Sequence, residues 1–231
     1  MNVLETLRQQ LAQREDRRCS SVDLLSSGTE PLDRLLPRGG FLPGTLIEWL
    51  APTPSAVGTL ALLSAREAMA RRGGYVVVFD RARNFYPPAA AAWGIDLQRL
   101  LVVQPANHRD ELWAIDQALR CEAVAAVWAP LAHLESKLDS HCLRRWQLAA
   151  EQSGALGLLL RPASARQLPC WSDAQVQVRP HAQRGPDEHW RLHIELLKVR
   201  GGNAGGSAEL EIHASSLGSS LASSLGSLGP S

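Results

Sequence analysis

Short apolar runs alternate with segments of helical periodicity through the middle of the chain, and this alternation restricts the possible folds more than any other feature. Five runs are long enough to be strands covered on both faces, at residues 46–50, 75–80, 100–103, 123–128 and 155–160. Segments with the length of crossover helices lie between them, at residues 57–72, 109–121 and 136–152. Repeated β-α-β units of this kind predict an α/β fold with a mostly parallel sheet and helices on both sides.

After this repeating part, apolar and polar residues alternate one by one. Residues 174–179 follow a period of two, and Leu192, Ile194 and Leu196 do the same. A glycine-rich turn at residues 201–206 then leads to a last short run at residues 208–213, which predicts a hairpin. We therefore expect antiparallel C-terminal strands at one edge of the sheet.

The two ends of the chain differ from the middle in composition. Residues 2–14 carry four apolar side chains on one helical face, and the polar stretch that follows is typical of a linker. Residues 214–231 consist mainly of Ser, Leu, Gly and Ala without any charge, which predicts disorder. The expected organisation is an N-terminal helix and linker at residues 1–21, one domain at residues 22–213 and a tail at residues 214–231.

Charge and cysteine content exclude several functional classes. The formal net charge of +1 gives no broad field that would attract nucleic acid or an anionic membrane. No apolar run approaches the roughly 20 residues that a bilayer span needs, and no secretory leader is evident. The four cysteines form no CxxC pair, and the histidines show no metal-binding spacing. We expect a cytoplasmic protein with reduced thiols, no metal and no membrane contact.

An ordered set of small motifs precedes the first apolar run. It consists of Ser27-Gly28, Leu32-Asp33, Gly39-Gly40 and Pro43-Gly44. This set resembles the entry to the RecA core. Over residues 26–212 the chain resembles the ImuA group, RecA-like accessory proteins of bacterial translesion synthesis that are sometimes described as similar to the SulA cell-division inhibitor. The resemblance implies a RecA-like P-loop core.

The same resemblance places a phosphate-binding loop at residues 51–59, but the residues that bind phosphate and Mg²⁺ are absent from it. In the pattern GxxxxGK[ST], the glycines let backbone N–H groups surround the phosphates, the lysine neutralises them and the hydroxyl binds Mg²⁺. In this frame the two glycine positions, the lysine position and the hydroxyl position hold Ala51, Ala56, Val57 and Gly58, followed by Thr59. We interpret this segment as a degenerate nucleotide-binding loop.

Two further elements of the RecA site are also missing. Pro130 stands near the end of the strand where a magnesium-binding aspartate is expected, and Ala82 stands where a glutamate would orient the attacking water. Asp80 is the carboxylate that remains nearby, and we expect it to stabilise a turn. Together the losses predict a chain without catalytic residues, without ATPase activity and without a cofactor.

Lys198 and Arg200 resemble the two basic residues with which RecA reaches into the ATP site of the neighbouring subunit. They form a candidate partner interface, and the alternative is that they are solvated positions on an edge strand. The loops with which RecA binds DNA are nearly absent after residue 131 and short at residues 161–169. Direct DNA contact is therefore expected to be weak and limited to Arg161 and Arg166.

The seven tryptophans are numerous beside three phenylalanines and two tyrosines. Those in or beside expected strands are assigned to the core: Trp49, Trp128 and Trp171. Others lie on expected helices with undetermined exposure: Trp93, Trp113 and Trp146. An exposed tryptophan would be a candidate interface anchor, because this residue is enriched at binding hot spots.

The resemblance implies an adaptor in the SOS-type DNA damage response. Its partners would be RecA and an ImuB-type protein related to Y-family polymerases, with an error-prone replicative-type polymerase as a further partner in translesion synthesis. Two alternatives stay open. One is an ATPase with a non-standard phosphate loop, which titration with a fluorescent ATP analogue tests. The other is a SulA-like inhibitor of cell division, which should cause filamentation when overexpressed.

Overall fold

The computed structural model describes residues 24–52, 54–131, 138–168, 170–180 and 190–212, with the backbone alone at residues 54–56 and 190. The helix and linker expected at residues 1–21 and the tail expected at residues 214–231 lie outside the described residues. Within the described part, eight strands form one sheet in the order β3-β2-β4-β5-β1-β6-β7-β8. The fold is α/β with a mostly parallel sheet, as the sequence predicts.

The five apolar runs form the parallel strands of this sheet: β1 (Leu46–Ala51), β2 (Tyr75–Phe79), β3 (Leu100–Val103), β4 (Val124–Pro130) and β5 (Leu156–Pro162). The alternating segments form β6 (Ala174–Pro180), β7 (Trp190–Val199) and β8 (Ser207–Ile212). β7 pairs antiparallel with both of its neighbours, so the expected C-terminal hairpin is confirmed. β6 pairs parallel with β1 and antiparallel with β7, and it joins the two parts of the sheet.

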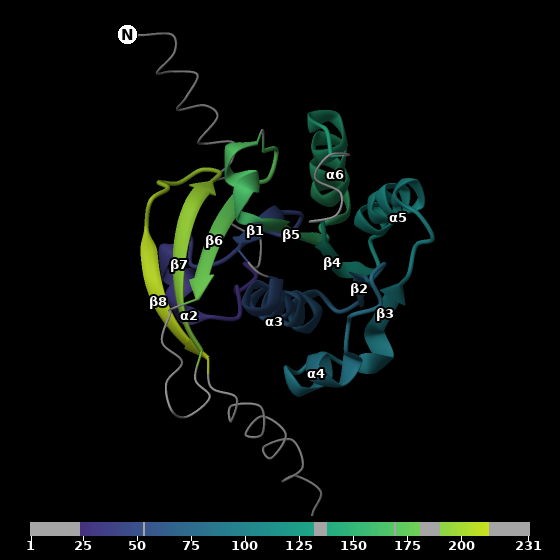
Figure 1. Cartoon of the computed structure of the whole chain (residues 1–231), viewed down its shortest axis with the longest axis horizontal. Coiled ribbons are helices and arrows are strands. Elements are labelled where there is room, and N and C mark those ends of the chain that lie inside the picture. Colours follow the sequence, from purple (N-terminus) through teal and green to yellow (C-terminus); the bar gives the residue numbers. More distant parts are fainter. Residues whose placement is uncertain (1–23, 53, 132–137, 169, 181–189, 213–231) are drawn as a thin grey trace, which may run out of the picture.

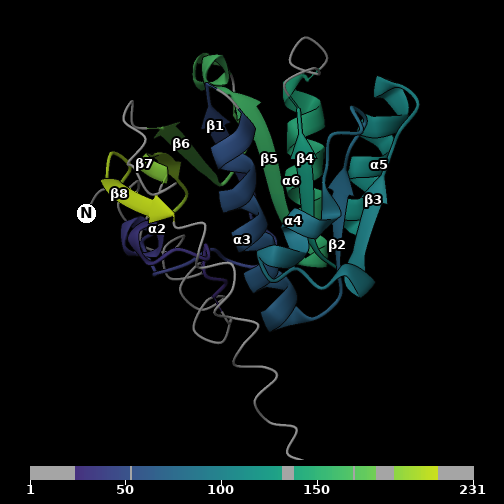
Figure 2. The ribbon, with the colours of Figure 1, turned by 60° about the horizontal axis from the view of Figure 1, so that its bottom comes forward.

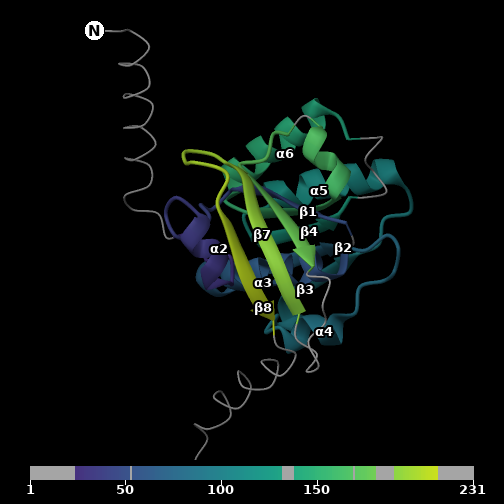
Figure 3. The same cartoon turned by 60° about the vertical axis from the view of Figure 1, so that its left-hand side comes forward.

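Helices cover both faces of the sheet (Figure 1). α3 (Pro54–Arg72) and α4 (Pro87–Ala92) lie on one face, and α5 (His108–Arg120) and α6 (Ser140–Ser153) lie on the other. Figure 2 shows α3 running along β1 and β5. The short α2 (Glu30–Leu35) contacts β8, and Figure 3 shows it beside that edge. Two 3-10 turns, η1 (Leu97–Arg99) and η3 (Ala163–Gln167), complete the described elements.

The two helices on the second face begin at side-chain caps. Asn107 accepts a hydrogen bond from the backbone N–H of Asp110 at 3.0 Å, and Asp139 accepts one from that of Cys142 at 2.6 Å. Such caps satisfy donors that the first helical turn leaves free. The cap at Asp139 explains why α6 starts at Ser140, later than the helix predicted over residues 136–152. The first two residues of that prediction lie outside the described part.

The sheet separates two apolar clusters. One lies against α3 and includes Ile47, Leu60 and Val76, and the other lies against α5 and α6 and includes Phe79 and Trp146. Helices on both faces therefore explain why most of the strands are continuously apolar.

The two edges of the sheet carry different side chains. Leu101 and Val102 of β3 are 49% and 38% exposed, so the prediction that this strand is covered on both faces is wrong. β3 is an edge strand and has a neighbouring strand on one side alone. The other edge strand, β8, carries Glu209 and Glu211, which pair with side chains of β7. Charges of this kind protect an edge from pairing with another sheet.

Candidate functional site

The segments that lack the expected nucleotide-binding residues all lie at the carboxyl ends of the parallel strands. β1 ends at Ala51 and α3 begins at Pro54, β4 ends at Pro130, and the loop after β2 begins at Asp80. Because these strands are parallel, their carboxyl ends lie along the same edge, where α/β proteins bind their ligands. The structure thus brings together the loop at residues 51–59 and the positions of Pro130 and Ala82.

The indole of Trp128, from β4, packs against the beginning of α3. Its Nε1–H donates a hydrogen bond to the Gly58 carbonyl at 3.2 Å, and a Cβ on Gly58 would lie 3.4 Å from its Cζ2. Phe85, from the loop after β2, places its ring centroid 5.6 Å from that of Trp128, with an angle of 57° between the planes. The Trp128 indole therefore lies against α3 at the position where the frame expects a magnesium-binding hydroxyl, and Phe85 contacts this indole.

The other loop positions also lack phosphate-binding chemistry. Val57, at the lysine position, is 1% exposed and belongs to the apolar cluster under α3. Ala51 is buried and Thr59 is half-buried, while the side chain of Ala56 lies outside the described residues. Pro52 and Pro54 have no backbone N–H to donate. The segment offers no cation and fewer backbone donors than the GxxxxGK[ST] pattern.

The loop after β2 is organised around Asp80. Its carboxylate accepts hydrogen bonds from the backbone N–H groups of Asn84 at 2.8 Å and Phe85 at 3.1 Å. Asp80 itself is 6% exposed, and Ala82 presents its methyl group to solvent. The carboxylate therefore stabilises a turn, as the sequence predicts, and it also positions the backbone of Phe85.

Lys198 and Arg200 lie at the other end of the strands, where β1 begins. Val199 pairs with Ala174, which is level with Ile47 near the start of β1, so the end of β7 is far from the end of β1. Lys198 Nζ donates to the carbonyl of Cys170 at 3.1 Å. These basic residues therefore do not reach the chain's own degenerate loop.

Arg200 is held by two carboxylates. Its Nη1 lies 2.6 Å from Glu151 Oε1 and 3.1 Å from Asp173 Oδ1, while its side chain stays 55% exposed. The hydrogen bond to Glu151 is the main cause that raises the pKa of Arg200 above its ordinary value. The guanidinium is positioned by the fold and still accessible from outside.

A buried ion pair was not anticipated from the sequence. Arg161 Nη1 lies 3.0 Å from Glu48 Oε1, with the two side chains 2% and 0% exposed, and Gln175 Nε2 donates to Glu48 Oε2 at 3.0 Å. The prediction that Arg161 contacts phosphates is therefore wrong, because the guanidinium is buried in the domain and pairs with Glu48. Arg166 is exposed and donates to Gln177 at 3.0 Å. The sequence does contain a signal for this pair, because Glu48 and Arg161 are each the one charged residue of an otherwise apolar strand.

The described side chains offer little for metal or nucleophilic chemistry. No group of three His, Cys, Asp or Glu residues in the described ranges is arranged to hold a metal ion. Burial raises the pKa of the Cys142 thiol to about 11 and also raises that of Cys170. Both thiols therefore stay protonated at neutral pH, and the thiolate is the nucleophilic form. No helix among the described residues is long and apolar enough to cross a membrane.

The tryptophans occupy three kinds of environment. Trp49 and Trp146 are fully buried, and Trp128 is half-buried beside Phe85. Trp171 is 43% exposed, so its assignment to the core is wrong, and the Arg144 guanidinium lies 5.1 Å from its ring centroid. Trp113 on α5 is 64% exposed.

Comparison with known proteins relates this chain to RecA. Protein RecA of Prochlorococcus marinus (strain MIT 9211) is 33% identical over 129 residues, which are 53% of this chain and 35% of that protein. Protein RecA of Arthrospira platensis is 37% identical over 129 residues, which are 52% of this chain and 34% of that protein. This chain thus spans about a third of the length of the curated RecA proteins that it matches.

A solved structure extends the fold comparison beyond that segment. The crystal structure of the RadB recombinase superposes with a TM-score of 0.62, at 19% sequence identity, over 80% of this chain and 94% of that one. At this identity the likeness concerns the fold. The RecA N-terminal domain family matches residues 8–138, a range that contains the degenerate loop, Ala82 and Pro130. The chain belongs to the RecA N-terminal domain family.

Proposed function

We propose that this chain is a RecA-like adaptor of the ImuA type that has no ATPase activity. It supports error-prone translesion synthesis in the SOS-type damage response by binding RecA and an ImuB-type partner related to Y-family polymerases. The observation that carries the proposal is the packing of Trp128, which Phe85 contacts, against the start of α3, where Val57 and Gly58 stand in place of lysine and hydroxyl. Membership of the RecA family supports the connection with DNA repair.

The loss of nucleotide binding follows from the charges that are missing. Hydrogen bonds to charged groups contribute about 1.5–3 kcal/mol each. The lysine that pairs with the phosphates is absent, and so are the hydroxyl and the aspartate that hold Mg²⁺. If each loss counts at least as much as one such bond, three contributions are lost. Because about 1.4 kcal/mol corresponds to a tenfold change in affinity, ATP binds at least about a thousandfold more weakly than at an intact site.

A titration with a fluorescent ATP analogue and Mg²⁺ tests this part of the proposal. We expect no saturable binding up to about 1 mM, the upper end of common KM values. Trp128→Ala removes the indole beside Gly58 without adding a cation and should bind no better, whereas intact RecA serves as the positive control. Micromolar binding accompanied by phosphate release would contradict the proposal and favour the ATPase alternative.

The positions of Lys198 and Arg200 support an asymmetric adaptor. They lie at the end of the strands opposite the degenerate loop, and Arg200 remains 55% exposed although Glu151 and Asp173 hold it. In this arrangement the chain presents the two cations to the nucleotide site of an adjoining RecA subunit. It offers no working site of its own on the other side, so it joins the end of a filament.

Replacing Lys198 and Arg200 together by alanine should weaken binding to RecA at least tenfold. The domain should stay folded with an unfolding free energy lower by about 1–3 kcal/mol, because Asp173, whose side chain is 10% exposed, loses one of its partners. The measurement is a titration of the full chain against immobilised RecA. Arg191→Ala is a matched control, since Arg191 lies on the same strand in an exposed pair with Glu211. Unchanged affinity of the double variant would refute the assigned interface.

A further inference from the structure

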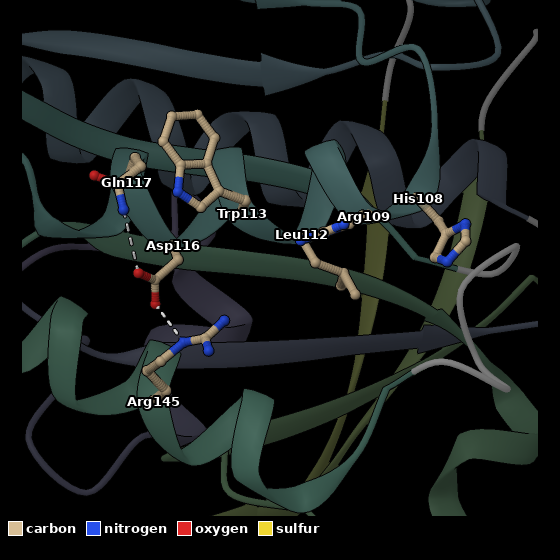
Figure 4. A pocket seen from close by; sticks show the side chains of 7 residues that line it. All are labelled: His108, Arg109, Leu112, Trp113, Asp116, Gln117 and Arg145. Atoms are coloured by element: carbon tan, nitrogen blue, oxygen red, sulfur yellow. Dashed lines mark hydrogen bonds and ion pairs between the residues drawn. The ribbon is translucent and has the colours of Figure 1, made fainter.

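A groove of about 580 Å³ lies along the outer side of α5, on the sheet face opposite α3. Figure 4 shows Arg145 reaching from α6 toward Asp116 on α5, within a lining of seven residues: His108, Arg109, Leu112, Trp113, Asp116, Gln117 and Arg145. This groove is separate from the degenerate loop, because α3 and the aromatic pair lie on the other side of the sheet.

Trp113 provides an apolar surface at this groove. Ile115 and Leu119 of the same helix are fully buried against the sheet, whereas Trp113 is 64% exposed, the most among the tryptophan side chains that the structure describes. Leu112 lies next to it and is half-buried. A partly exposed indole beside an aliphatic side chain is the kind of anchor that protein interfaces use, since tryptophan is enriched at hot spots.

The charge that the groove presents to solvent is positive. Asp116 is the one carboxylate of the lining, its side chain is 9% exposed, and it is neutralised by Arg120 and Arg145 at 2.8 Å each. Arg109 is exposed and forms no ion pair within the described structure. The adjoining carboxylate of Asp110 is exposed and accepts a hydrogen bond from the Asn107 side chain. The three guanidinium groups of Arg109, Arg120 and Arg145 thus outnumber the two carboxylates of Asp110 and Asp116 in this region by one.

We propose that this groove binds an acidic segment of a protein partner, in which carboxylates flank an apolar side chain that packs on Trp113. Charge complementarity supports this choice, because carboxylates pair well with guanidinium groups. A second copy of the chain that packed through the same face would place Arg109 and Arg145 against like charges. A nucleic-acid strand is less favoured, because its backbone needs a continuous row of cations, and the carboxylates of Asp110 and Asp116 interrupt the positive charge here.

The inference goes beyond the proposed function and does not depend on it. The probe is a library of random twelve-residue peptides displayed on phage, selected on the full chain after depletion on the Trp113→Ala variant. The enriched peptides should carry Asp or Glu beside an aromatic or aliphatic residue. One enriched peptide is then synthesised with a fluorophore and titrated by anisotropy, in parallel with an oligonucleotide of thirty thymidines.

Trp113→Ala and Arg109→Glu should each weaken peptide binding at least tenfold. Glutamate is compatible with the first turn of α5, where the helix dipole favours negative charge, so the fold should persist. Tyr86→Ala is the control for Trp113, since Tyr86 is 67% exposed elsewhere, and Arg71→Glu on α3 is the control for charge reversal. The proposal is overturned if the selection shows no acidic enrichment, if both variants bind the peptide normally, or if they lose affinity for the oligonucleotide alone.

Discussion

Glu48→Ala is expected to lower the free energy of unfolding by about 3–5 kcal/mol, because it breaks a buried ion pair by removing the carboxylate that Arg161 contacts at 3.0 Å. Both side chains are almost fully enclosed, at 0% and 2% exposure, so water cannot replace the lost carboxylate without disturbing the sheet. Gln175 loses a hydrogen-bond acceptor as well. Chemical denaturation monitored by circular dichroism measures the loss directly.

The combined variant Glu48→Leu with Arg161→Met separates the cost of removing one partner of the pair from the cost of removing both. Replacing a buried ion pair by apolar side chains of similar size is often neutral, so the combined variant should recover at least half of the loss. The remainder reflects Gln175, whose amide keeps no acceptor at this site. A combined variant as unstable as Glu48→Ala would contradict this explanation. Arg34→Ala, in a pair 75% exposed on both sides, provides the surface control.

Gly28→Ala should destabilise the fold by a similar amount, about 2–5 kcal/mol. Gly28 has a φ of +84°, and a Cβ there would lie 2.6 Å from the Cβ of Leu63 on α3. The left-handed conformation costs an L-residue about 1–2 kcal/mol, and overpacking costs about 1–3 kcal/mol more. Thermal and urea unfolding of the purified variant measure the sum.

Gly39→Ala distinguishes the two contributions to this loss. Gly39 has a comparable φ of +77°, but no atom lies within 4 Å of the Cβ that alanine would add. It should therefore lose about 1–2 kcal/mol, the conformational part alone. Equal losses in the two variants would show that the close approach of Gly28 to α3 does not contribute.

The strands were predictable from the sequence because their signal is local. A run such as residues 75–79 is apolar throughout when helices cover both faces, and the alternation after residue 190 identifies the antiparallel strands at the edge. The order of the strands carries no such signal. α2 and α4 were not predicted, because each has six residues, with proline among the first two, and is too short for helical periodicity to be recognised.

The candidate site was predictable in part. The frame of residues 51–59 identifies the lost lysine and hydroxyl positions without any coordinates, but the contact between Trp128 and Gly58 joins residues 70 positions apart. Only the folded sheet brings these two segments together. The exposure of Trp113 could have been predicted from helix geometry. At 100° per residue, Trp113 lies about 200° around the helix from Ile115, and Ile115 is buried.

The packing of Trp128 against α3 also changes how this part of the domain is stabilised. A bound nucleotide stabilises a protein in proportion to the logarithm of its free concentration, so its contribution varies with the supply in the cell. The indole belongs to the same chain and cannot be diluted, depleted or competed away by mass action. The contacts at the start of α3 therefore form during folding, and their contribution to stability does not depend on the concentration of nucleotide in the cell.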